Sequence, residues 1–555
     1  MTEGSSSAPR FATHEVFNQP LPLVDYDLFS SDRALVEAVR REGAEDAVPS
    51  LAAFGRRLGS AEVIEWGFQA NRVTPVLQSF DRFGRHRDVV EFHPAWHELM
   101  ALAVGEGLHT GPWAEPKPGA HVARAAQVYM QCQIEAGVQC PITMTYGAVP
   151  ALRQQAEIAA EWLPRLYSLR YDGRFRPARE KTGALMGMGM TEKQGGSDLR
   201  TNTTTATPAE GGGPGTVYRL VGHKWFFSAP MCDAFLVLAQ AAKGPSCFFL
   251  PRWTPDGEPN ALRLRRLKDK LGNRSNASSE VEFENAAAWL VGEEGRGIPV
   301  IIEMATYTRL DCAAASAGLM RQALAQATHH AANRTAFQRR LVDQPVMVNV
   351  LADLALEVEA ATALALRLAH AFDQPEDTRE SAFRRLMTPA AKYWICKRAI
   401  TVAGEAMEVL GGNGYVEESM MPRLYREMPV NSIWEGSGNV MCLDVLRALS
   451  RTPDAAEALR AELTPARGAD ARLDRAVTAL EATLAARPEE GQARRLVERI
   501  VHAVQAALLV RHAPPAVADA FCASRLDGDH GGAFGTLARG ADLVGIVERA
   551  RPAID

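Results

Sequence analysis

The chain has 555 residues, and its 61 basic and 66 acidic side chains give a net charge of −5. This length exceeds one ordinary domain, so we expect two to four packed units. The near balance of charge excludes a globally basic, nucleic-acid-binding character, although it leaves room for a local basic patch.

Simple patterns exclude several other classes of protein. No stretch approaches the roughly 18 uninterrupted apolar residues that a membrane helix requires. Residues 1–10 lack the apolar core of a signal peptide. The eight cysteines are scattered without a Cys-x-x-Cys pair, which favours buried thiols over disulfides or a zinc site. His329 and His330 form an isolated pair, so we predict no metal site and a cytoplasmic protein without membrane contact.

The predicted elements divide the chain into four parts. Residues 1–180 predict an N-terminal arm and a helical domain, because apolar and charged residues alternate at helical spacing. Residues 181–290 predict a β domain of short apolar runs separated by glycine and proline turns. Residues 291–450 predict a bundle of long Ala- and Leu-rich helices, and residues 451–555 predict a further helical extension. The predicted fold class is therefore α+β.

One segment, Asn431–Asn439, places the carboxylate of Glu435 between the indole of Trp434 and a glycine. Desolvation beside an aromatic ring raises the pKa of a carboxyl group toward neutrality, as a general base requires. The glycines would also let a flat cofactor approach. Taken alone, the segment is more often a surface turn after a helix.

A second segment, Gly187–Asp198, gathers glycine, hydroxyl and amide groups ahead of the predicted β domain. Such loops offer free N–H groups to phosphate or carbonyl oxygens. The segment lacks the third glycine and the βαβ context of a dinucleotide fingerprint. A tight structural turn is the simpler interpretation of this loop by itself.

Three further patterns are weaker. Trp225–Ser228 puts three aromatic rings and a hydroxyl on one predicted strand, which most often marks a core. Gly411–Tyr415 is also compatible with a helix end and turn. Arg263–Arg274 holds six basic residues against one acid, which predicts a solvated strand face or, as the sharper alternative, a contact with a polyanion.

Taken in order, these segments resemble the acyl-CoA dehydrogenase family over roughly residues 60–450. The resemblance implies FAD at the junction of the β domain and the helices, with Glu435 as the catalytic base. It also implies that Arg334–Phe337 completes the FAD site of a neighbouring subunit. The cofactor-binding residues that it implies are Met188, Met190, Thr191, Gly196, Ser197, Phe226, Phe227, Ser228, Arg334, Phe337, Gly411, Gly412, Trp434, Gly436, Ser437 and Asn439.

The segments 190–197, 221–228, 268–277 and 422–439 are similar to one branch of the family, the AidB flavoproteins of the bacterial alkylation response. This likeness implies a homotetramer, arranged as a dimer of dimers, that carries FAD and binds double-stranded DNA mainly through its C-terminal region.

Three positions depart from the usual family pattern. Gln338 stands where many members have glycine, and Glu408 stands where many have glutamine, so an acid replaces an amide near the expected phosphates. Trp434 replaces a common tyrosine and would narrow the pocket beside Glu435. We therefore expect an acyl-CoA-like small molecule without a long acyl chain.

The C-terminal extension is not basic: 14 Arg and no Lys against 15 acidic residues in 451–555 give a net charge of about −1. Because DNA affinity depends on phosphate neutralisation, a DNA surface would need segregated arginines. The candidates are Arg494, Arg495, Arg499 and Arg511. A solvated face with i/i+4 ion pairs is an equal alternative.

Two functions follow. The first is an AidB-like FAD enzyme in which Glu435 removes an α-proton while a hydride passes to flavin N5, in a DNA alkylation response. The alternative is a metabolic short- or branched-chain acyl-CoA dehydrogenase whose extension only stabilises the tetramer.

Overall fold

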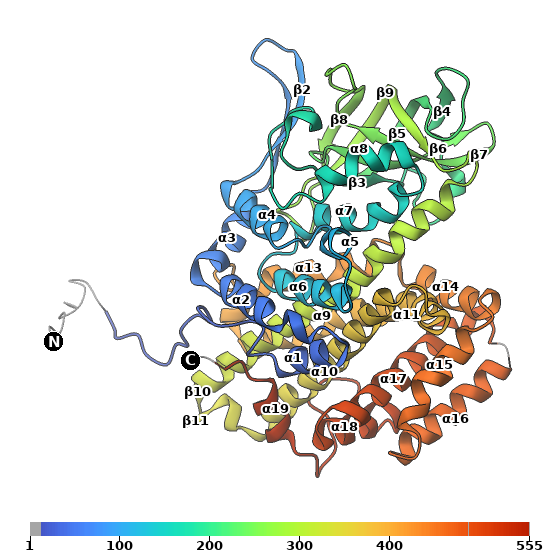
Figure 1. Cartoon of the computed structure of the whole chain (residues 1–555). Helices are drawn as coiled ribbons and strands as arrows, with labels where there is room; N and C mark the ends of the chain where they lie inside the picture. Colours follow the sequence, from blue (N-terminus) through green and yellow to red (C-terminus); the bar gives the residue numbers. More distant parts are fainter. Residues whose placement is uncertain (1–12, 487, 554–555) are drawn as a thin grey trace.

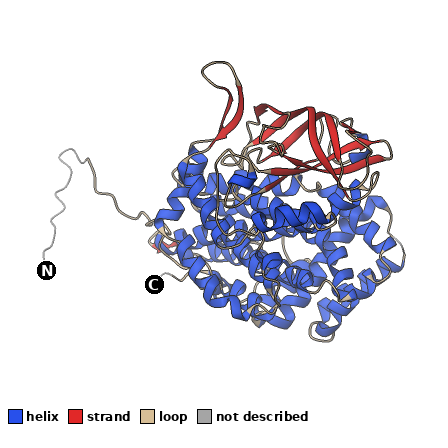
Figure 2. Cartoon of the chain, turned by 45° about the horizontal axis from the view of Figure 1, so that its top comes forward, coloured by secondary structure: helices blue, strands red, loops and turns tan. Residues whose placement is uncertain are grey.

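The computed structural model describes residues 13–486 and 488–553. A β domain lies at one end of a large helical body, and the C-terminal extension lies at the other (Figures 1 and 2). This arrangement confirms the predicted α+β class. Within the described residues, no helix is long and apolar enough to cross a membrane.

The N-terminal domain is mostly helical. Its helices are α1 (Arg33–Arg41), α2 (Val48–Leu58), α3 (Ala61–Arg72), α4 (Pro94–Gly105), α5 (Gly111–Ala114), α6 (Ala120–Ile134), α7 (Gln139–Leu152) and α8 (Ala156–Leu166). Sequence patterns missed the hairpin of β1 (Val76–Phe80) and β2 (His86–Glu91), which projects from the body in Figure 1. Most of its residues are exposed or half-buried, so it lacks the apolar alternation that marks a strand.

The β domain is a seven-stranded sheet. Its strands are β3 (Met186–Gly189), β4 (Thr205–Pro208), β5 (Val217–Ser228), β6 (Ala234–Ala241), β7 (Gly244–Pro251), β8 (Leu262–Leu267) and β9 (Ser278–Val291). Strand β7 pairs with both β6 and β9, so the sheet curls round on itself. Of the strands that carry the predicted cofactor segments, β3 packs against α7, and the paired strand β6 contacts α9.

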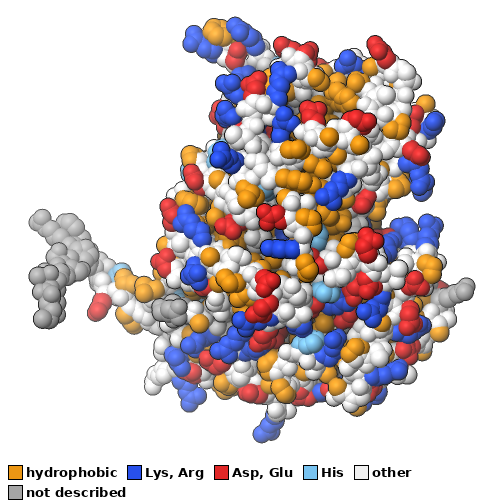
Figure 3. All heavy atoms as spheres, in the orientation of Figure 1, with side chains coloured by type: hydrophobic (Ala, Val, Ile, Leu, Met, Phe, Trp, Pro, Cys, Tyr) orange, Lys and Arg blue, Asp and Glu red, His pale blue; other side chains and the backbone are white. Residues whose placement is uncertain are grey.

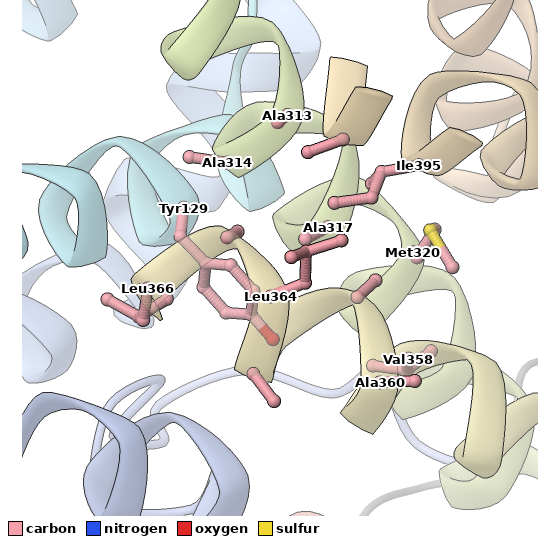
Figure 4. Close-up of a cluster of buried hydrophobic side chains, with 14 of the residues drawn as sticks. Tyr129, Ala313, Ala314, Ala317, Met320, Val358, Ala360, Leu364, Leu366 and Ile395 are labelled. Carbon is pink, nitrogen blue, oxygen red and sulfur yellow. The ribbon is translucent and has the colours of Figure 1, made fainter. Parts of the chain in front are cut away.

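Three long helices form the central bundle: α9 (Gly297–Asn333), α10 (Pro345–Asp373) and α11 (Thr378–Val409). They pack through small and branched residues such as Ala313, Ala317 and Leu364, with Tyr129 of α6 between them (Figure 4). Shorter elements complete the bundle. These are β10 (Thr335–Ala336), β11 (Arg339–Arg340), α12 (Gly412–Tyr415), α13 (Met421–Ile433) and α14 (Gly438–Arg451).

The C-terminal extension covers the bundle rather than standing apart from it (Figure 1). Its helices are α15 (Ala455–Leu463), α16 (Ala471–Ala485), α17 (Ala493–His512), α18 (Pro515–Phe521) and α19 (Leu543–Ala550). α17 packs against α10, α11 and α14, and α19 packs against α10. Buried ion pairs also join the extension to α10, since Arg525 pairs with Asp353 at 2.5 Å and with Glu357 at 2.9 Å.

Candidate active site

Glu435 sits in the short turn between α13 and α14. Its backbone has φ of +58°, a left-handed conformation that is uncommon for a residue with a side chain. The next residue, Gly436, has φ of +105°, which only glycine adopts readily. Strained residues of this kind persist where the surroundings hold them in place, and they cluster at functional sites.

Three buried side chains hold this turn. The Thr308 hydroxyl donates to Oε2 of Glu435 at 2.6 Å, and Arg309 Nε donates to the Glu435 carbonyl at 2.8 Å. From the neighbouring helix α11, Lys392 Nζ donates to the carbonyls of Trp434 at 2.8 Å and Gly436 at 2.5 Å. Two bundle helices therefore fix the turn on both sides of the carboxylate.

The electrostatics of Glu435 suit a proton acceptor. Burial raises the pKa of its carboxyl group above the ordinary value, while the Thr308 hydrogen bond and the charges of Arg309 and Lys392 oppose part of the rise. Thr308 occupies Oε2, whereas Oε1 accepts no hydrogen bond from the described residues. The backbone N–H of Glu435 likewise meets no acceptor among them.

The loop after β3 contains Thr191, Gly196 and Ser197. A side chain at Gly196 would collide with the Thr191 side chain, so glycine is needed for the loop to fold back on itself. Its base is fixed by the fully buried ion pair of Glu192 and Lys224 at 2.7 Å. Ser197 at the tip is exposed, and Thr191 is half-buried.

The residues on β5 divide between two faces. The ring of Phe226 is 53% exposed, and the hydroxyl of Ser228 lies 3.3 Å from that of Ser278. Phe227 is fully buried against Phe235, with ring centroids 4.4 Å apart. The prediction that Phe227 lines a cofactor is therefore wrong for its side chain, because strand alternation turns that ring into the β-domain core.

Contacts join the β domain to the Glu435 turn. Met188, Met190 and Trp434 are all half-buried and pack against the same β-domain core. Cys140 on α7 lies between the two parts: burial raises the pKa of its thiol to about 12, Glu435 adds to the rise, and a hydrogen bond with Ser228 opposes it. The structure thus brings the β3 loop, β5 and Glu435 to one junction.

Four further predicted cofactor residues, Arg334, Phe337, Gly411 and Gly412, lie away from Glu435, toward the C-terminal end of α9. Arg334 follows this helix, and Phe337 occupies the tip of the β10–β11 hairpin, where it is 93% exposed with φ of +50°. Asn18 of the N-terminal arm donates to the Thr335 carbonyl at 2.8 Å and accepts from Arg334. The arm therefore packs onto the hairpin, although its residues before 13 lie outside the described range.

The Gly411–Gly412 turn is close to that hairpin. Asn413 in this turn donates to Gln19, the arm residue next to Asn18, at 3.1 Å. Both glycines are exposed, and Cβ atoms added to them would meet open space. Glu408, one turn earlier, is also exposed, and its carbonyl accepts from the Gly411 N–H at 2.9 Å.

Within one chain, the predicted cofactor residues near Glu435 lie far from those near Arg334 and the β10–β11 hairpin. Thr308, which holds Glu435, and Arg334 are 26 residues apart along α9, so about 39 Å of helix lies between them at about 1.5 Å per residue. The hairpin and the Glu435 turn of one chain therefore do not face a common ligand.

Beyond Glu435 the chain enters α14 through Ser437 and Asn439. Asn439 is exposed, and its side-chain oxygen accepts from Arg494 Nε at 2.9 Å. Arg494 begins α17 in the C-terminal extension, so a residue predicted for DNA contacts one predicted for the cofactor.

The other predicted DNA-binding arginines do not form one surface. Arg495 and Arg499 are exposed near the start of α17, and Arg499 donates to Thr483 at 3.3 Å. Arg511 lies at the opposite end of the helix and faces Glu462 at 3.6 Å. Placing it with the first three was wrong, because about four turns of helix separate it from Arg495.

The basic run 263–274 forms a ladder of ion pairs. Arg265 meets Glu282 at 2.5 Å, and Arg266 and Lys268 both meet Glu280 at 2.7 Å, across the pairing of β8 with β9. Its first half is the solvated strand face that the sequence favoured. The positive charges there are neutralised within the sheet.

Sequence patterns missed the residues that support the site. Thr308, Arg309 and Lys392 lie inside long helices whose composition gives no sign of a site, and only folding brings them to Glu435. One signal was available: an arginine or lysine at a buried helical position needs a partner. Among the described residues, no group of three or more His, Cys, Asp or Glu side chains could hold a metal ion.

Comparison with known proteins agrees with this geometry. Residues 18–173 match the adaptive response protein AidB N-terminal domain, residues 187–286 match the acyl-CoA dehydrogenase middle domain, and residues 295–450 match the acyl-CoA dehydrogenase C-terminal domain. AidB of Escherichia coli (strain K12), named as an acyl-CoA dehydrogenase, is 51% identical over 517 residues, which cover 93% of this chain and 95% of that protein.

Solved structures show the same fold. ACDH-11 of Caenorhabditis elegans in complex with C11-CoA superposes with a TM-score of 0.82 at 26% identity, covering 99% of this chain and 94% of that one. An acyl-CoA dehydrogenase from Bacillus anthracis complexed with FAD has a TM-score of 0.64 at 17% identity, covering 78% of this chain and 81% of that one. The second likeness concerns the fold alone.

The chain belongs to the acyl-CoA dehydrogenase family, whose members are FAD-dependent oxidoreductases. Within that family, the match of its N-terminal domain and its identity to the Escherichia coli protein assign it to the AidB branch.

Proposed function

We propose that this chain is an AidB-like flavoenzyme in which Glu435 removes the α-proton of a bound acyl thioester. The observation that carries the proposal is the environment of the Glu435 carboxylate. Thr308 donates a hydrogen bond to Oε2, whereas Oε1 accepts none from the described residues, and burial raises the pKa of the carboxyl group. A base of this kind is held in position yet able to accept a proton. The free N–H of Glu435 is suited to polarise the thioester carbonyl.

The residues present fit FAD. The β3 loop folds tightly at Gly196 and offers Thr191 and Ser197 as hydroxyl donors, while Phe226 offers an exposed ring beside Ser228. FAD, when bound, supplies the acceptor for the hydride that leaves the acyl β-carbon. Trp434, anchored by its Nε1 on Asn431 at 3.0 Å, would narrow the space beside Glu435 and favour short or branched acyl groups.

The exposed hairpin supports assembly of subunits. Phe337 is almost fully exposed, and the helical distance keeps it from the Glu435 turn of its own chain. We therefore propose that Arg334, Phe337, Gly411 and Gly412 complete the FAD site of a neighbouring copy, in a homotetramer arranged as a dimer of dimers.

The test of the base is Glu435→Gln, which keeps the size of the side chain and removes its basicity. We expect the purified variant to retain FAD in the visible spectrum but to lose flavin bleaching by short acyl-CoAs. The matched control is Glu98→Gln, an exposed acid on α4 away from the proposed site, which should bleach normally. Bleaching by Glu435→Gln at the wild-type rate would refute the assignment.

Duplex DNA binding, as part of an alkylation response, is a second proposal. This proposal is supported by Arg495, which has no ion-pair partner in the described part of the chain, and by the exposed Arg451 on the adjacent α14. Arg447 on α14 is also exposed, although it pairs with Asp444 at 3.3 Å. Figure 3 shows basic side chains gathered over this region. Much of the remaining basic charge in the extension is ion-paired, for example Arg472 with Asp470 at 2.6 Å.

DNA binding is tested at about 50 mM salt, where phosphate contacts are strongest. We expect Arg495→Gln with Arg499→Gln to weaken duplex binding, and Arg475→Gln, whose arginine pairs with Asp527, to leave it unchanged. No duplex affinity in the wild type would favour the alternative, in which the extension only stabilises the tetramer of a metabolic enzyme.

A further inference from the structure

A cavity of about 420 Å³ lies where the N-terminal domain, the bundle and the C-terminal extension meet. The end of α1, the end of α10, the start of α11, helix α15 and the end of α17 all contribute to its lining. None of the residues assigned above to FAD or to the acyl thioester lines it. We propose that this cavity is a binding site for a small phosphate-bearing anion.

Four guanidinium groups line the cavity, from Arg41, Arg367, Arg379 and Arg511. Three carboxylates also line it, and each of them already has an arginine partner. Arg367 forms a two-pronged pair with Glu380 at 2.9 Å and also donates to Glu462 at 2.9 Å. One buried arginine therefore holds both carboxylates, although Oε1 of Glu462 accepts no hydrogen bond from the described residues and lies 3.6 Å from Arg511.

The other three arginines retain capacity for an anion. One terminal nitrogen of Arg41 is buried without a hydrogen-bond partner, although its Nε meets Glu42 at 2.8 Å. Arg379 is exposed and makes no ion pair with the described residues, and Arg511 lies 3.6 Å from a Glu462 that Arg367 already holds. A buried donor without an acceptor costs free energy that a bound anion would recover.

Two of these cations, Arg41 and Arg511, act on one further side chain of the lining, His512. Burial lowers the pKa of His512 to about 4, and the charges of Arg41 and Arg511 add to this fall, so both guanidinium groups act on the same imidazole. Arg41 comes from the N-terminal domain and Arg511 from the extension. An anion bound between them would offset the electrostatic repulsion between the two guanidinium groups.

Size and chemistry define the class of ligand. Pockets for small molecules span about 300–1,000 Å³, so the cavity suits a phosphorylated metabolite or a nucleotide. Guanidinium groups bind phosphate through paired N–H donors, which favours phosphate over a monovalent anion. A bound anion would contact Arg41 of the N-terminal domain and Arg511 of the extension, and would thereby stabilise the contact between these two parts.

The experiment measures binding of pyrophosphate by calorimetry at low salt, using the FAD-loaded protein so that the flavin's own phosphate site is filled. We expect one pyrophosphate per chain in the wild type. Arg379→Gln with Arg511→Gln should weaken it about tenfold or more, as loss of charge-assisted hydrogen bonds predicts. Arg475→Gln, on α16 outside the cavity, should match the wild type.

Folding is checked by circular dichroism. Arg379 makes no ion pair with the described residues and the Arg511–Glu462 pair is long, at 3.6 Å, so the double variant should melt like the wild type. Tighter binding of ADP than of pyrophosphate would indicate that the site takes a nucleotide. Equal binding of the two would indicate that it recognises the phosphate groups alone. Either result supports the site, provided that the double variant loses the binding. Absence of saturable binding in the wild type, or equal affinity in the double variant, would overturn the proposal.

Discussion

Arg494 Nε donates a hydrogen bond to Oδ1 of Asn439 at 2.9 Å, and this bond joins the C-terminal extension to the segment that carries Glu435. The guanidinium also lies 5.9 Å from the ring centroid of Tyr393 on α11. Gly438, between Glu435 and Asn439, leaves room for this contact, since a Cβ there would stand 3.4 Å from Arg494 and 3.3 Å from Tyr393. The extension therefore contacts the active-site turn directly.

We expect Arg494→Ala to weaken retention of FAD and to slow flavin reduction by short acyl-CoAs several-fold. The bond is partly exposed, so its loss should cost the fold no more than about 1 kcal/mol. Dialysis against buffer followed by visible spectroscopy measures the retention. Arg495→Ala is the matched control, because its side chain is exposed and makes no described contact; equal retention in both variants would contradict a role for the Asn439 bond.

Thr308→Val should move the acidic limb of the rate of flavin reduction to higher pH. Glu435 must be ionised to accept a proton, and its pKa is already raised by burial. The Thr308 hydrogen bond stabilises the ionised form and lowers that pKa, so removing it raises the pKa further. The pH profile with a short acyl-CoA measures this shift, and Thr306→Val, two residues away on the exposed face, serves as control. A shift to lower pH would be incompatible with this role.

Lys392→Met should destabilise the chain by roughly 3 kcal/mol, because it leaves two half-buried carbonyls without their charged donor. The carbonyls belong to Trp434 and Gly436, so FAD binding should fall together with stability. Chemical unfolding followed by tryptophan fluorescence measures the loss. Lys397→Met on the same helix should change stability by less than about 0.5 kcal/mol.

Phe337→Ser should leave the unfolding of each chain unchanged, since the ring is 93% exposed and makes no buried contact. If Phe337 completes the site of a neighbouring subunit, the variant should nevertheless lose FAD. Flavin content per chain after gel filtration measures this effect. Phe83→Ser, between β1 and β2, replaces an aromatic residue that is 66% exposed and controls for loss of apolar surface. Full flavin content in Phe337→Ser would argue against a shared site.

Lys224→Met should cost about 3–5 kcal/mol, because it leaves Glu192 as an unpaired charge in a buried position. The double variant with Glu192→Gln should recover part of the loss by removing that charge. Thermal unfolding of the three proteins measures the coupling. Similar stability in the single and double variants would show that the hydrogen bonds that Glu192 already accepts, such as that from the Thr203 N–H at 2.6 Å, are enough to hold its charge.

Much of the fold was predictable because its signals are local. The long helices α9, α10 and α11 follow from Ala- and Leu-rich periodicity, and β9 follows from its alternating Glu280–Glu284. The β1–β2 hairpin was missed because its exposed strands carry no such pattern. Phe227 was misassigned because neighbouring strand residues look alike in sequence, and only pairing shows which face is buried.

The sequence by itself determined the class of protein and the position of the base that we propose, since the Glu435 segment and the glycine loop depend on residue types that remain next to one another in the chain. The tertiary structure decided what surrounds that base. Thr308 and Lys392 reach it from helices 127 and 43 residues away along the chain, and Arg494 approaches from the extension. Contacts over such separations arise from packing, which no local pattern encodes.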